Sequence, residues 1–465
     1  MKTRRIWAAV AAAVLLMAAG CAKTAPETSG NSAEKQPDGT EAATAAETPA
    51  AADSTEAAET AGASDTENAG ADESGESETA SEPEKEKIVI PEISIPAKEL
   101  PDSESLRFVR ALGVGFSCGN TFDAYVDGGL DDEMKTETAW IPVPLTEETI
   151  KAYHSAGFDS VRIPVSWHNH VSEDFTISEK WLARVKEAVD WAIGDGMNVI
   201  LNIHHDNHPE ADAFYPDAEH LEQSKQYVKR IWEQLSETFG GYDEHLIFEG
   251  LNEPRLVGTD LEWSVRSGDA KSDEALSCIN ELNQLFVDTV RASGGNNSTR
   301  YLMVPGYAGS PDGVLSKNFT LPADPADPEG TAHRIILEVH AYTPYDFALK
   351  PGGGSFFSIS VKACTRDIDA FMDKLYSTYV SKGTPVIIDE FGAVSRLNKD
   401  GELNIRDRVE YSAYYVAAAR ARGMSCFVWD NGASEGDGEL FGLYSRSEKV
   451  FVFPEIVETL VKYGK

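Results

Sequence analysis

Eight short runs rich in β-branched residues, separated by longer amphipathic stretches, are what most constrains the fold of this 465-residue chain. The runs span residues 112–116, 160–164, 199–204, 246–252, 301–304, 334–340, 386–391 and 426–430. The stretches between them have helical periodicity; in residues 180–193, for example, Trp181, Val185 and Ala188 fall on one helical face. Eight strands that alternate with helices predict an α/β chain with a (β/α)8 TIM barrel and enlarged loops.

The alternative fold is an open, doubly wound sheet, which requires a glycine-rich phosphate turn after its first strand. The segment from Gly113 to Gly119 does not match G-x-G-x-x-G and continues into a loop. We therefore predict the barrel, and we assign it to residues 99–465.

The first 20 residues have the pattern of an export signal. Basic residues at positions 2, 4 and 5 precede an apolar run over 6–20, which is too short for a comfortable membrane span and suits a signal peptide. The run ends in the sequence AAGC at 18–21, and small residues before a cysteine are typical of bacterial lipoprotein signals. We predict cleavage before Cys21, lipidation of its thiol, and an exported protein that is anchored to the cell membrane and faces outward. An ordinary signal peptide with a chance cysteine is the alternative.

Residues 21–98 have the composition of a spacer. No Phe, Trp or Tyr occurs between residues 8 and 107, and Ala, Glu, Thr, Ser, Gly, Asp and Pro dominate the segment. Such a chain cannot bury enough apolar surface to offset the entropy of ordering it. We therefore predict a lipidated Cys21 followed by a disordered acidic linker, with a strand-like lead-in at 88–96.

The overall charge limits the partners of the chain. Its formal net charge is −36, which repels nucleic-acid phosphates, so we expect no nucleic-acid partner. Five cysteines make neither a disulfide framework nor a C-x-x-C metal site. Whether Cys118, Cys278, Cys364 and Cys426 pair is left open. We expect a monomer.

Side chains suited to chemistry cluster at the predicted strand ends. In chain order they are Arg162, Trp167, Asn202, His204, His205, Asn252, Glu253, His340, Tyr342, Glu390 and Trp429. Each has an ordinary interpretation alone, as a solvated acid or a core aromatic. Because the carboxyl ends of all strands of a (β/α)8 barrel meet at one mouth, six such strand ends predict one active site there.

Glu253 and Glu390 are the pair of carboxyl groups that sugar hydrolysis needs. One group must be protonated to donate to the leaving oxygen, and the other must be ionised to attack the anomeric carbon. Strands four and seven lie across the mouth from each other, so the two side chains can approach to about 5 Å, as in retaining glycosidases.

At these motifs, over roughly residues 105–465, the chain resembles glycoside hydrolase family 5, a family of barrel β-glycanases. The resemblance implies Glu253, in Asn252-Glu253-Pro254, as acid/base and Glu390 as nucleophile. It also implies substrate-site roles for Arg162, His204, Asn252, His340, Tyr342 and Trp429, and no metal or organic cofactor. The motifs GNTFDA at 119–124, ETAW at 137–140 and HHD at 204–206 are similar to those of the endo-β-1,4-glucanase and xyloglucanase subfamily, which adds Asn120, Trp140 and His205.

The chain departs from the family pattern at several positions. Phe116-Ser117-Cys118 stands where the subfamily usually has Trp-Asn-Leu, and Asp389 replaces the usual glycine before the nucleophile. Neighbours on a strand point to opposite faces, which allows Asp389 to face the helices. If it faces the mouth instead, its charge disfavours a second anion at Glu390.

The predicted function is retaining, endo-acting hydrolysis of β-1,4-glucosidic bonds in cellulose-type glucan, xyloglucan or mixed-linkage glucan, the polysaccharide partner. Loop aromatics are candidates to extend the sugar platform of Trp429: Trp140, Trp167, Trp263, Tyr215 and Tyr345.

Three other functions are alternatives. They are a β-mannanase of the same family, a catalytically impaired glycan-binding lipoprotein, and a metal hydrolase using His204, His205, His208, His340 and Glu253. The glycan-binding alternative predicts a missing carboxylate, yet both are present. The metal alternative is disfavoured because adjacent histidines on a strand point apart and no H-E-x-x-H motif occurs.

Overall fold

The computed structural model describes residues 87–209 and 213–465. The predicted signal peptide, Cys21 and the linker up to residue 86 lie outside these described residues. Within them, no helix combines the length and the apolar character that a membrane crossing requires. The four cysteines of the described part, at positions 118, 278, 364 and 426, are all free thiols.

Eight parallel strands close into a barrel in the order in which they occur along the chain, with β8 paired to β1. They are β1 (Val114–Cys118), β2 (Ser160–Ile163), β3 (Asn198–Asn202), β4 (Leu246–Glu249), β5 (Leu302–Pro305), β6 (Ile335–His340), β7 (Val386–Phe391) and β8 (Ser425–Asp430). All eight overlap the predicted runs, so the predicted (β/α)8 fold is confirmed. A short antiparallel pair, β9 (Tyr444–Ser445) and β10 (Val450–Phe451), follows the barrel.

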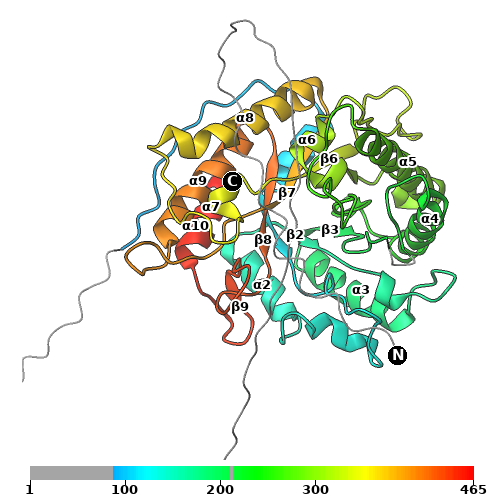
Figure 1. Cartoon of the computed structure of the whole chain (residues 1–465), viewed down its shortest axis with the longest axis horizontal. Helices are drawn as coiled ribbons and strands as arrows, with labels where there is room; N and C mark the ends of the chain where they lie inside the picture. Colours follow the sequence, from blue (N-terminus) through cyan, green and yellow to red (C-terminus); the bar gives the residue numbers. More distant parts are fainter. Residues whose placement is uncertain (1–86, 210–212) are drawn as a thin grey trace, which may run out of the picture. The chain divides into compact units, whose positions relative to one another are not determined.

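Helices surround the central strands (Figure 1). They are α1 (Glu104–Ala111), α2 (Glu147–Ala156), α3 (Glu179–Gly194), α4 (Leu221–Thr238), α5 (Ala270–Ala292), α6 (Pro311–Val314), α7 (Tyr345–Ala348), α8 (Lys362–Thr378), α9 (Ile405–Ala421) and α10 (Pro454–Gly464). The apolar face predicted from Trp181, Val185 and Ala188 is the buried face of α3.

The barrel interior is layered. One layer is apolar and lies at the end of the barrel where α1 is found. It includes Ile200, Ile247, Ile336 and Ile387, which pack with Val109 and Leu112. Two residues further along the same four strands stand buried polar side chains, Asn202, Glu249, Glu338 and Asp389. Because side chains alternate along a strand with period two, each polar residue lies directly above an apolar one.

Strand β7 contains a bulge that interrupts this alternation. Against β6, Ile387 pairs with Glu338 and Glu390 pairs with His340, so three steps on β7 match two on β6. Against β8 a similar shift occurs between Ile388 and Phe391. An extra residue in one strand re-aims the side chains that follow it. Asp389 therefore continues the inward row of Ile387, and Glu390 also turns inward.

Residues 87–100, the N-terminal strap, run in an extended path along α8, α9 and α10. The strap is tied by hydrogen bonds from Ile93 N to Tyr463 Oη at 2.9 Å and from Lys98 N to the Ala421 carbonyl at 2.7 Å. Ile88, Ile95 and Leu100 pack against the hydrophobic core. The packed part of the chain thus begins before residue 99, where the barrel domain was predicted to start.

A chain that begins at Ser103 loses the strap, whereas one that begins at residue 87 keeps it. We expect the shorter chain to lose about 2–4 kcal/mol in free energy of unfolding, because full burial of one aliphatic side chain contributes roughly 1.5–3 kcal/mol and three are partly buried here. Urea denaturation of the two chains measures the difference. Equal unfolding free energies would show that the strap does not stabilise the barrel.

Candidate active site

Six of the predicted side chains meet at the carboxyl end of the barrel. They are Arg162, Asn252, Glu253, His340, Tyr342 and Glu390. A continuous set of hydrogen bonds and ion pairs connects all six. Strands β2, β4, β6 and β7 or the residues just after them supply these groups, as the predicted convergence of strand ends requires.

Arg162 is completely buried and holds three partners in fixed positions. Its Nε and Nη2 donate to the two carboxylate oxygens of Glu249 at 2.6 and 2.7 Å. Nη2 also donates to Asn252 Oδ1 at 2.6 Å, and Nη1 donates to Glu390 Oε1 at 2.7 Å. The planar guanidinium suits such paired recognition, so the orientations of Asn252 and Glu390 both depend on Arg162.

Glu390 is buried and accepts hydrogen bonds on both oxygens. Arg162 contacts Oε1, and the Tyr342 hydroxyl donates to Oε2 at 3.0 Å. Burial raises the pKa of Glu390, the charges of Glu253 and Asp389 add to this rise, and His340 and Arg162 oppose it. Burial also raises the pKa of Tyr342 well above its usual range, so this hydroxyl keeps its proton and remains a donor.

Glu253 faces a histidine and an arginine. His340 Nδ1 lies 2.9 Å from Glu253 Oε1, and Arg255 Nη1 lies 3.3 Å from Oε2. Burial alone would raise the pKa of Glu253, but the hydrogen bond and charge of His340, with Arg255, lower it to about 2. Burial also opposes a charge on His340, yet Glu390, Asp389 and Glu253 raise the pKa of His340 well above its usual range. Without substrate, the proton between Glu253 and His340 therefore resides on His340.

The two catalytic candidates lie close together. One carboxylate oxygen of Glu253, one of Glu390 and a ring nitrogen of His340 lie within 4.8 Å of one another. His340 Nδ1 is 3.6 Å from Glu390 Oε2, so the ring stands beside both carboxylates.

Asp389 does not face the helices. It is completely buried inside the barrel, where Oδ2 lies 3.2 Å from Arg162 Nε and Oδ1 lies 3.6 Å from His340 Nε2. The bulge in β7 explains why both Asp389 and Glu390 point inward, since strict alternation would allow only one of them to do so.

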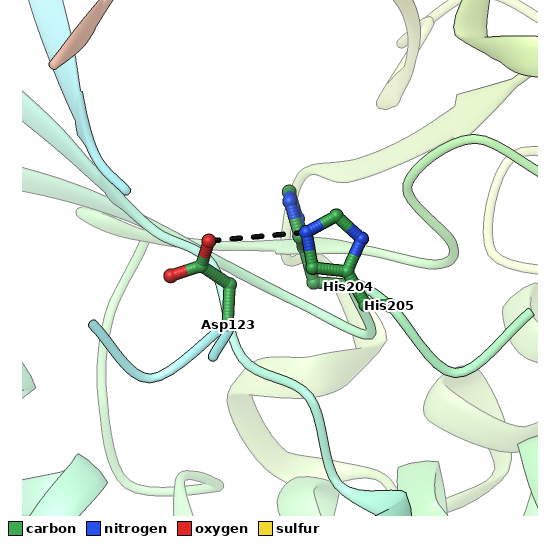
Figure 2. A group of neighbouring side chains, drawn as sticks. All are labelled: Asp123, His204 and His205. Atoms are coloured by element: carbon green, nitrogen blue, oxygen red, sulfur yellow. Dashed lines mark ion pairs between the residues drawn. The ribbon is translucent and has the colours of Figure 1, made fainter. Parts of the chain in front are cut away.

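A second group of site residues comprises Asp123, His204 and His205 (Figure 2). His205 Nε2 lies 3.9 Å from Asp123 Oδ2, and the rings of His204 and His205 are 4.3 Å apart in an edge-on arrangement. The expectation that these adjacent histidines point apart was wrong. Strand β3 ends at Asn202, so alternation does not apply to the two residues.

This second group is a poor metal site. Asn202 is oriented by the Val165 amide, which donates to Oδ1 at 2.9 Å, and its Nδ2 lies 3.1 Å from His204 Nδ1. Nδ1 of His204 therefore accepts. Burial, followed by the charges of His205 and Arg162, lowers the pKa of His204 well below its usual range, so the ring is neutral and carries its proton on Nε2. Neither nitrogen of His204 then offers a lone pair to a cation.

The aromatic residues divide into exposed and buried ones. The indole of Trp429 stacks in parallel with His204 at 5.8 Å, and a side chain at Gly119 would collide with it, because a Cβ there would lie 2.4 Å from the indole. Trp140 is 38% exposed and packs on His205 at 5.5 Å. Two other predicted aromatics are exposed, Trp263, whose ring lies under the Arg255 guanidinium, and Tyr345, which begins α7 rather than lying in a loop. Trp167 and Tyr215 are buried core residues.

The remaining predicted residue, Asn120, has a left-handed backbone conformation, and its amide donates to Asp123 Oδ2 at 2.9 Å. Burial raises the pKa of Asp123 to about 6, although the amides of Thr121 and Asn120 oppose this. Asn120 thus shapes the loop that holds Asp123.

The sequence analysis did not predict three buried acids as site residues: Glu249, Glu338 and Asp123. Burial raises the pKa of Glu249 to about 7, against the effect of Arg162. A signal was available, because Glu249 and Glu338 interrupt otherwise apolar strands, Leu-Ile-Phe-Glu and Ile-Ile-Leu-Glu-Val-His. A charged residue inside such a run is rarely buried without a partner.

Comparison with known proteins identifies one family. The sequence profile "Cellulase (glycosyl hydrolase family 5)" matches residues 126–435. "Endoglucanase B" of Neocallimastix patriciarum is 40% identical over 375 residues, covering 79% of this chain and 73% of that protein. "Endoglucanase 1" of Ruminococcus albus is 39% identical over 360 residues, covering 77% of this chain and 80% of that protein.

A solved structure is similar in fold and sequence. The family 5 lichenase from Caldicellulosiruptor sp. F32 superposes with a TM-score of 0.78 and is 48% identical, covering 82% of this chain and all of that one. A Glu-to-Gln variant of the same lichenase has been solved in complex with cellotetraose.

Arg162→Met removes the guanidinium and leaves Glu249 buried without its cationic partner, although Glu249 keeps the hydrogen bond from Asn202 Nδ2 at 2.7 Å. We expect a loss of about 3–5 kcal/mol in free energy of unfolding, the usual cost of breaking a buried ion pair. Arg107→Met is the matched control, because Arg107 pairs with Asp102 on the surface, where such pairs contribute about 0–1 kcal/mol. Denaturant unfolding of both variants measures the difference. Equal losses in free energy of unfolding would show that the buried contacts of Arg162 stabilise the protein no more than a surface ion pair does.

Proposed function

The chain belongs to glycosyl hydrolase family 5, the cellulase family, and we propose that this endoglucanase cleaves β-1,4-glucosidic bonds by double displacement with retention of configuration. One observation carries the proposal: a carboxylate oxygen of Glu253 and one of Glu390 lie within 4.8 Å of each other. Retaining glycosidases place their carboxyl groups about 5 Å apart, whereas inverting ones leave about 6.5–9.5 Å for a water molecule.

Glu390 is the proposed nucleophile. It must be ionised to attack the anomeric carbon, and it accepts hydrogen bonds from a permanently charged guanidinium and from the Tyr342 hydroxyl. Donors to a carboxylate favour its charged form and fix the direction of its lone pairs. These contacts hold both carboxylate oxygens of Glu390 in fixed positions.

Glu253 is the proposed acid/base. Taken alone, the pKa directions in the free site suit the opposite assignment, since Glu253 is ionised and the pKa of Glu390 is raised. The hydrogen-bond partners favour our assignment, because His340 can return its proton to Glu253 across 2.9 Å, whereas Arg162 cannot give a proton to Glu390. Glu253 and His340 then titrate as a pair with one mobile proton.

The other side chains bind and orient the sugar. Asn252 uses its carbonyl oxygen to accept from Arg162, which leaves its NH2 group to donate to a sugar 2-hydroxyl, a contact that strengthens as charge develops on the ring. Trp429 offers an apolar face, and the Nε2 proton of His204 is a donor beside it. The exposed Trp140 and Trp263 extend apolar surface beyond the central position.

The substrate is proposed from the relatives. The lichenase structure, its cellotetraose complex and the curated endoglucanases support a β-1,4-linked glucan backbone. We place mixed-linkage β-glucan first, with xyloglucan and cellulose-type glucan next. Nothing in the described site favours mannan, and both catalytic carboxylates are present, so the mannanase and the impaired glycan-binding protein are not preferred.

Export and anchoring remain proposals based on the first 21 residues. We propose a monomer held at the outer side of the cell membrane through a lipid on Cys21, with the acidic linker as a spacer. The apolar run, the AAGC sequence and the spacer composition support this arrangement.

The roles of the two glutamates can be separated with a dinitrophenyl glycoside, whose leaving group departs without protonation. We expect Glu253→Ala to release a burst of phenolate and then stall, with rescue by azide, because no base activates water. Glu390→Ala should give no burst, since no group attacks the anomeric carbon. On natural glucan, Glu253→Ala should lose about 10²–10⁴-fold in kcat or more. A burst in Glu390→Ala alone would reverse the assignment.

Endo-action and retention are tested on polymeric substrate. On barley β-glucan, xyloglucan and carboxymethyl cellulose, viscosity should fall quickly relative to the reducing ends released, as expected for internal cleavage. NMR should detect the β-anomer first, because two displacements restore the configuration. Release of monosaccharide alone would refute endo-action, and an initial α-anomer would refute the double displacement.

Anchoring is tested in cells that carry out lipoprotein processing. Cys21→Ala removes the only thiol that can be acylated at the predicted cleavage site, so the protein should move from the membrane fraction to the soluble or secreted fraction. Cys278→Ala is a control that leaves the signal intact. Membrane retention of the Cys21 variant would reject the lipid anchor.

A further inference from the structure

Two buried carboxyl groups stand behind His340, on the side away from the proposed catalytic pair. His340 Nε2 lies 3.4 Å from Glu338 Oε1 and 3.6 Å from Asp389 Oδ1, and the three atoms lie within 4.8 Å of one another. Asp389 reaches this point on the inward row of Ile387, and Glu338 reaches it two residues before His340 on β6. Both side chains are completely shielded from solvent.

Among the described residues, the four oxygens of these carboxyl groups and His340 Nε2 have no hydrogen-bond partner. Buried polar groups are almost always satisfied, and a buried charge without a counter-charge is costly. A proton on Nε2 turns His340 into a donor toward the two acids, and its charge adds to that of Arg162, which lies 3.2 Å from Asp389 Oδ2. His340 Nδ1 meanwhile faces Glu253, so the ring connects the buried acids to the catalytic site.

The charged surroundings of His340 come from several strands. They comprise Arg162 on β2, His204 after β3, Glu249 and Glu253 at β4, Glu338 on β6, Tyr342 after β6, and Asp389 and Glu390 on β7. Gly309, in the segment after β5, also stands against the ring, since a Cβ there would lie 3.2 Å from the imidazole Cγ. The ring therefore has little freedom to turn away from either pair of acids.

We propose that Asp389, supported by Glu338, is a positioning residue that keeps a proton on His340 Nε2 and thereby makes His340 Nδ1 the proton store of Glu253. This inference rests on the acid/base role proposed for Glu253. Asp389 acts through His340 and does not touch the substrate.

The two acids differ in charge. Asp389 forms an ion pair with Arg162, because its Oδ2 lies 3.2 Å from Nε of the guanidinium. No arginine in the described part of the chain contacts Glu338, and burial, with the charges of Glu249 and Asp389, raises its pKa well above the usual range against the opposing effect of His340, which favours the neutral acid. Asp389 is therefore the anion that retains the Nε2 proton.

The proton balance through a catalytic cycle is simple. The Nδ1 proton of the imidazolium moves to Glu253, which leaves a neutral ring protonated on Nε2. Glu253 transfers this proton to the leaving oxygen, the bond between that oxygen and the anomeric carbon breaks, and Glu390 bonds to the same carbon. In the second step Glu253 takes a proton from the attacking water, whose oxygen bonds to the anomeric carbon as the bond to Glu390 breaks. The proton on Glu253 then returns to His340 Nδ1, which restores the starting state. Throughout, the Nε2 proton stays beside Asp389.

Asp389→Asn removes the anion but keeps the shape. Without the Asp389 anion, the Glu253–His340 pair holds its mobile proton less tightly. In the pH profile of kcat/KM, the basic limb should therefore move to lower pH by about one pH unit. At a fixed alkaline pH, kcat should fall while KM stays close to that of the parent enzyme. Glu338→Gln replaces a neutral acid by a neutral amide, so its basic limb should move less than half as far.

Asp324→Asn is the matched control, because Asp324 is also a buried aspartate that pairs with an arginine, Arg291, at 2.8 Å. It should leave the position of the basic limb as in the parent, although it lowers stability. Thermal unfolding of every variant identifies any loss of activity that comes from unfolding.

A readout without substrate separates this inference from the proposed function. With ¹⁵N-labelled histidine, and the His340 signals assigned through His340→Gln, the imidazolium should persist to higher pH in the parent than in Asp389→Asn, by about one unit. The inference is overturned by equal midpoints in the two proteins. It is also overturned by one equivalent of a divalent metal in the purified enzyme, since a metal on Nε2 would replace the proton. A shifted midpoint in a protein that hydrolyses no glucan would contradict only the proposed function.

Discussion

The candidate active site depends on the hydrogen bonds and ion pairs made by the buried guanidinium of Arg162. It lies in the polar layer of a closed barrel and joins β2 to residues of β4 and β7 through Glu249, Asn252 and Glu390. Charge-assisted hydrogen bonds are strong in an interior of low dielectric, and their loss leaves uncompensated charge. The same contacts therefore stabilise the barrel end and set the direction of the proposed nucleophile, so fold stability and catalytic geometry cannot be separated at this residue.

Charge balance in the barrel mouth follows from this arrangement. Five acids, Glu249, Glu253, Glu338, Asp389 and Glu390, face three cationic groups, Arg162, Arg255 and His340. Full ionisation of all five would leave more buried anions than cations, so some acids retain protons, as the raised pKa values of Glu249 and Glu338 indicate. A site that holds protons in this way is suited to acid–base work, because moving one proton over a hydrogen-bond distance changes its chemical state.

Two departures from regular strand geometry position side chains of the candidate site. The bulge in β7 lets Glu390 turn inward directly after Asp389, which stands at the position where the family usually has glycine. The chain after β3 departs from strand geometry, which brings His204 and His205 together beside Trp429. In both places the barrel supplies the scaffold, and a departure from regular strand geometry supplies the chemistry.

The sequence by itself determined the eight strands and the helices between them, and it predicted most of the residues that the structure brings together in the candidate site. The spacing of hydrophobic residues along the chain identifies each strand and helix. In a closed barrel the carboxyl ends of the strands meet, so Glu253, His340 and Glu390, which lie at or just after strand ends, are expected to come together. Only the tertiary structure decided where Asp389 points, that Glu249 and Glu338 lie inside the barrel, and that the strap packs on α9 and α10. A single extra residue in β7 reverses the inward and outward pattern, and its position depends on hydrogen bonds to β6 and β8, which are distant in sequence. Which acids stay ionised depends likewise on neighbours from other strands, because a buried charge is stabilised only by the groups that the fold places around it.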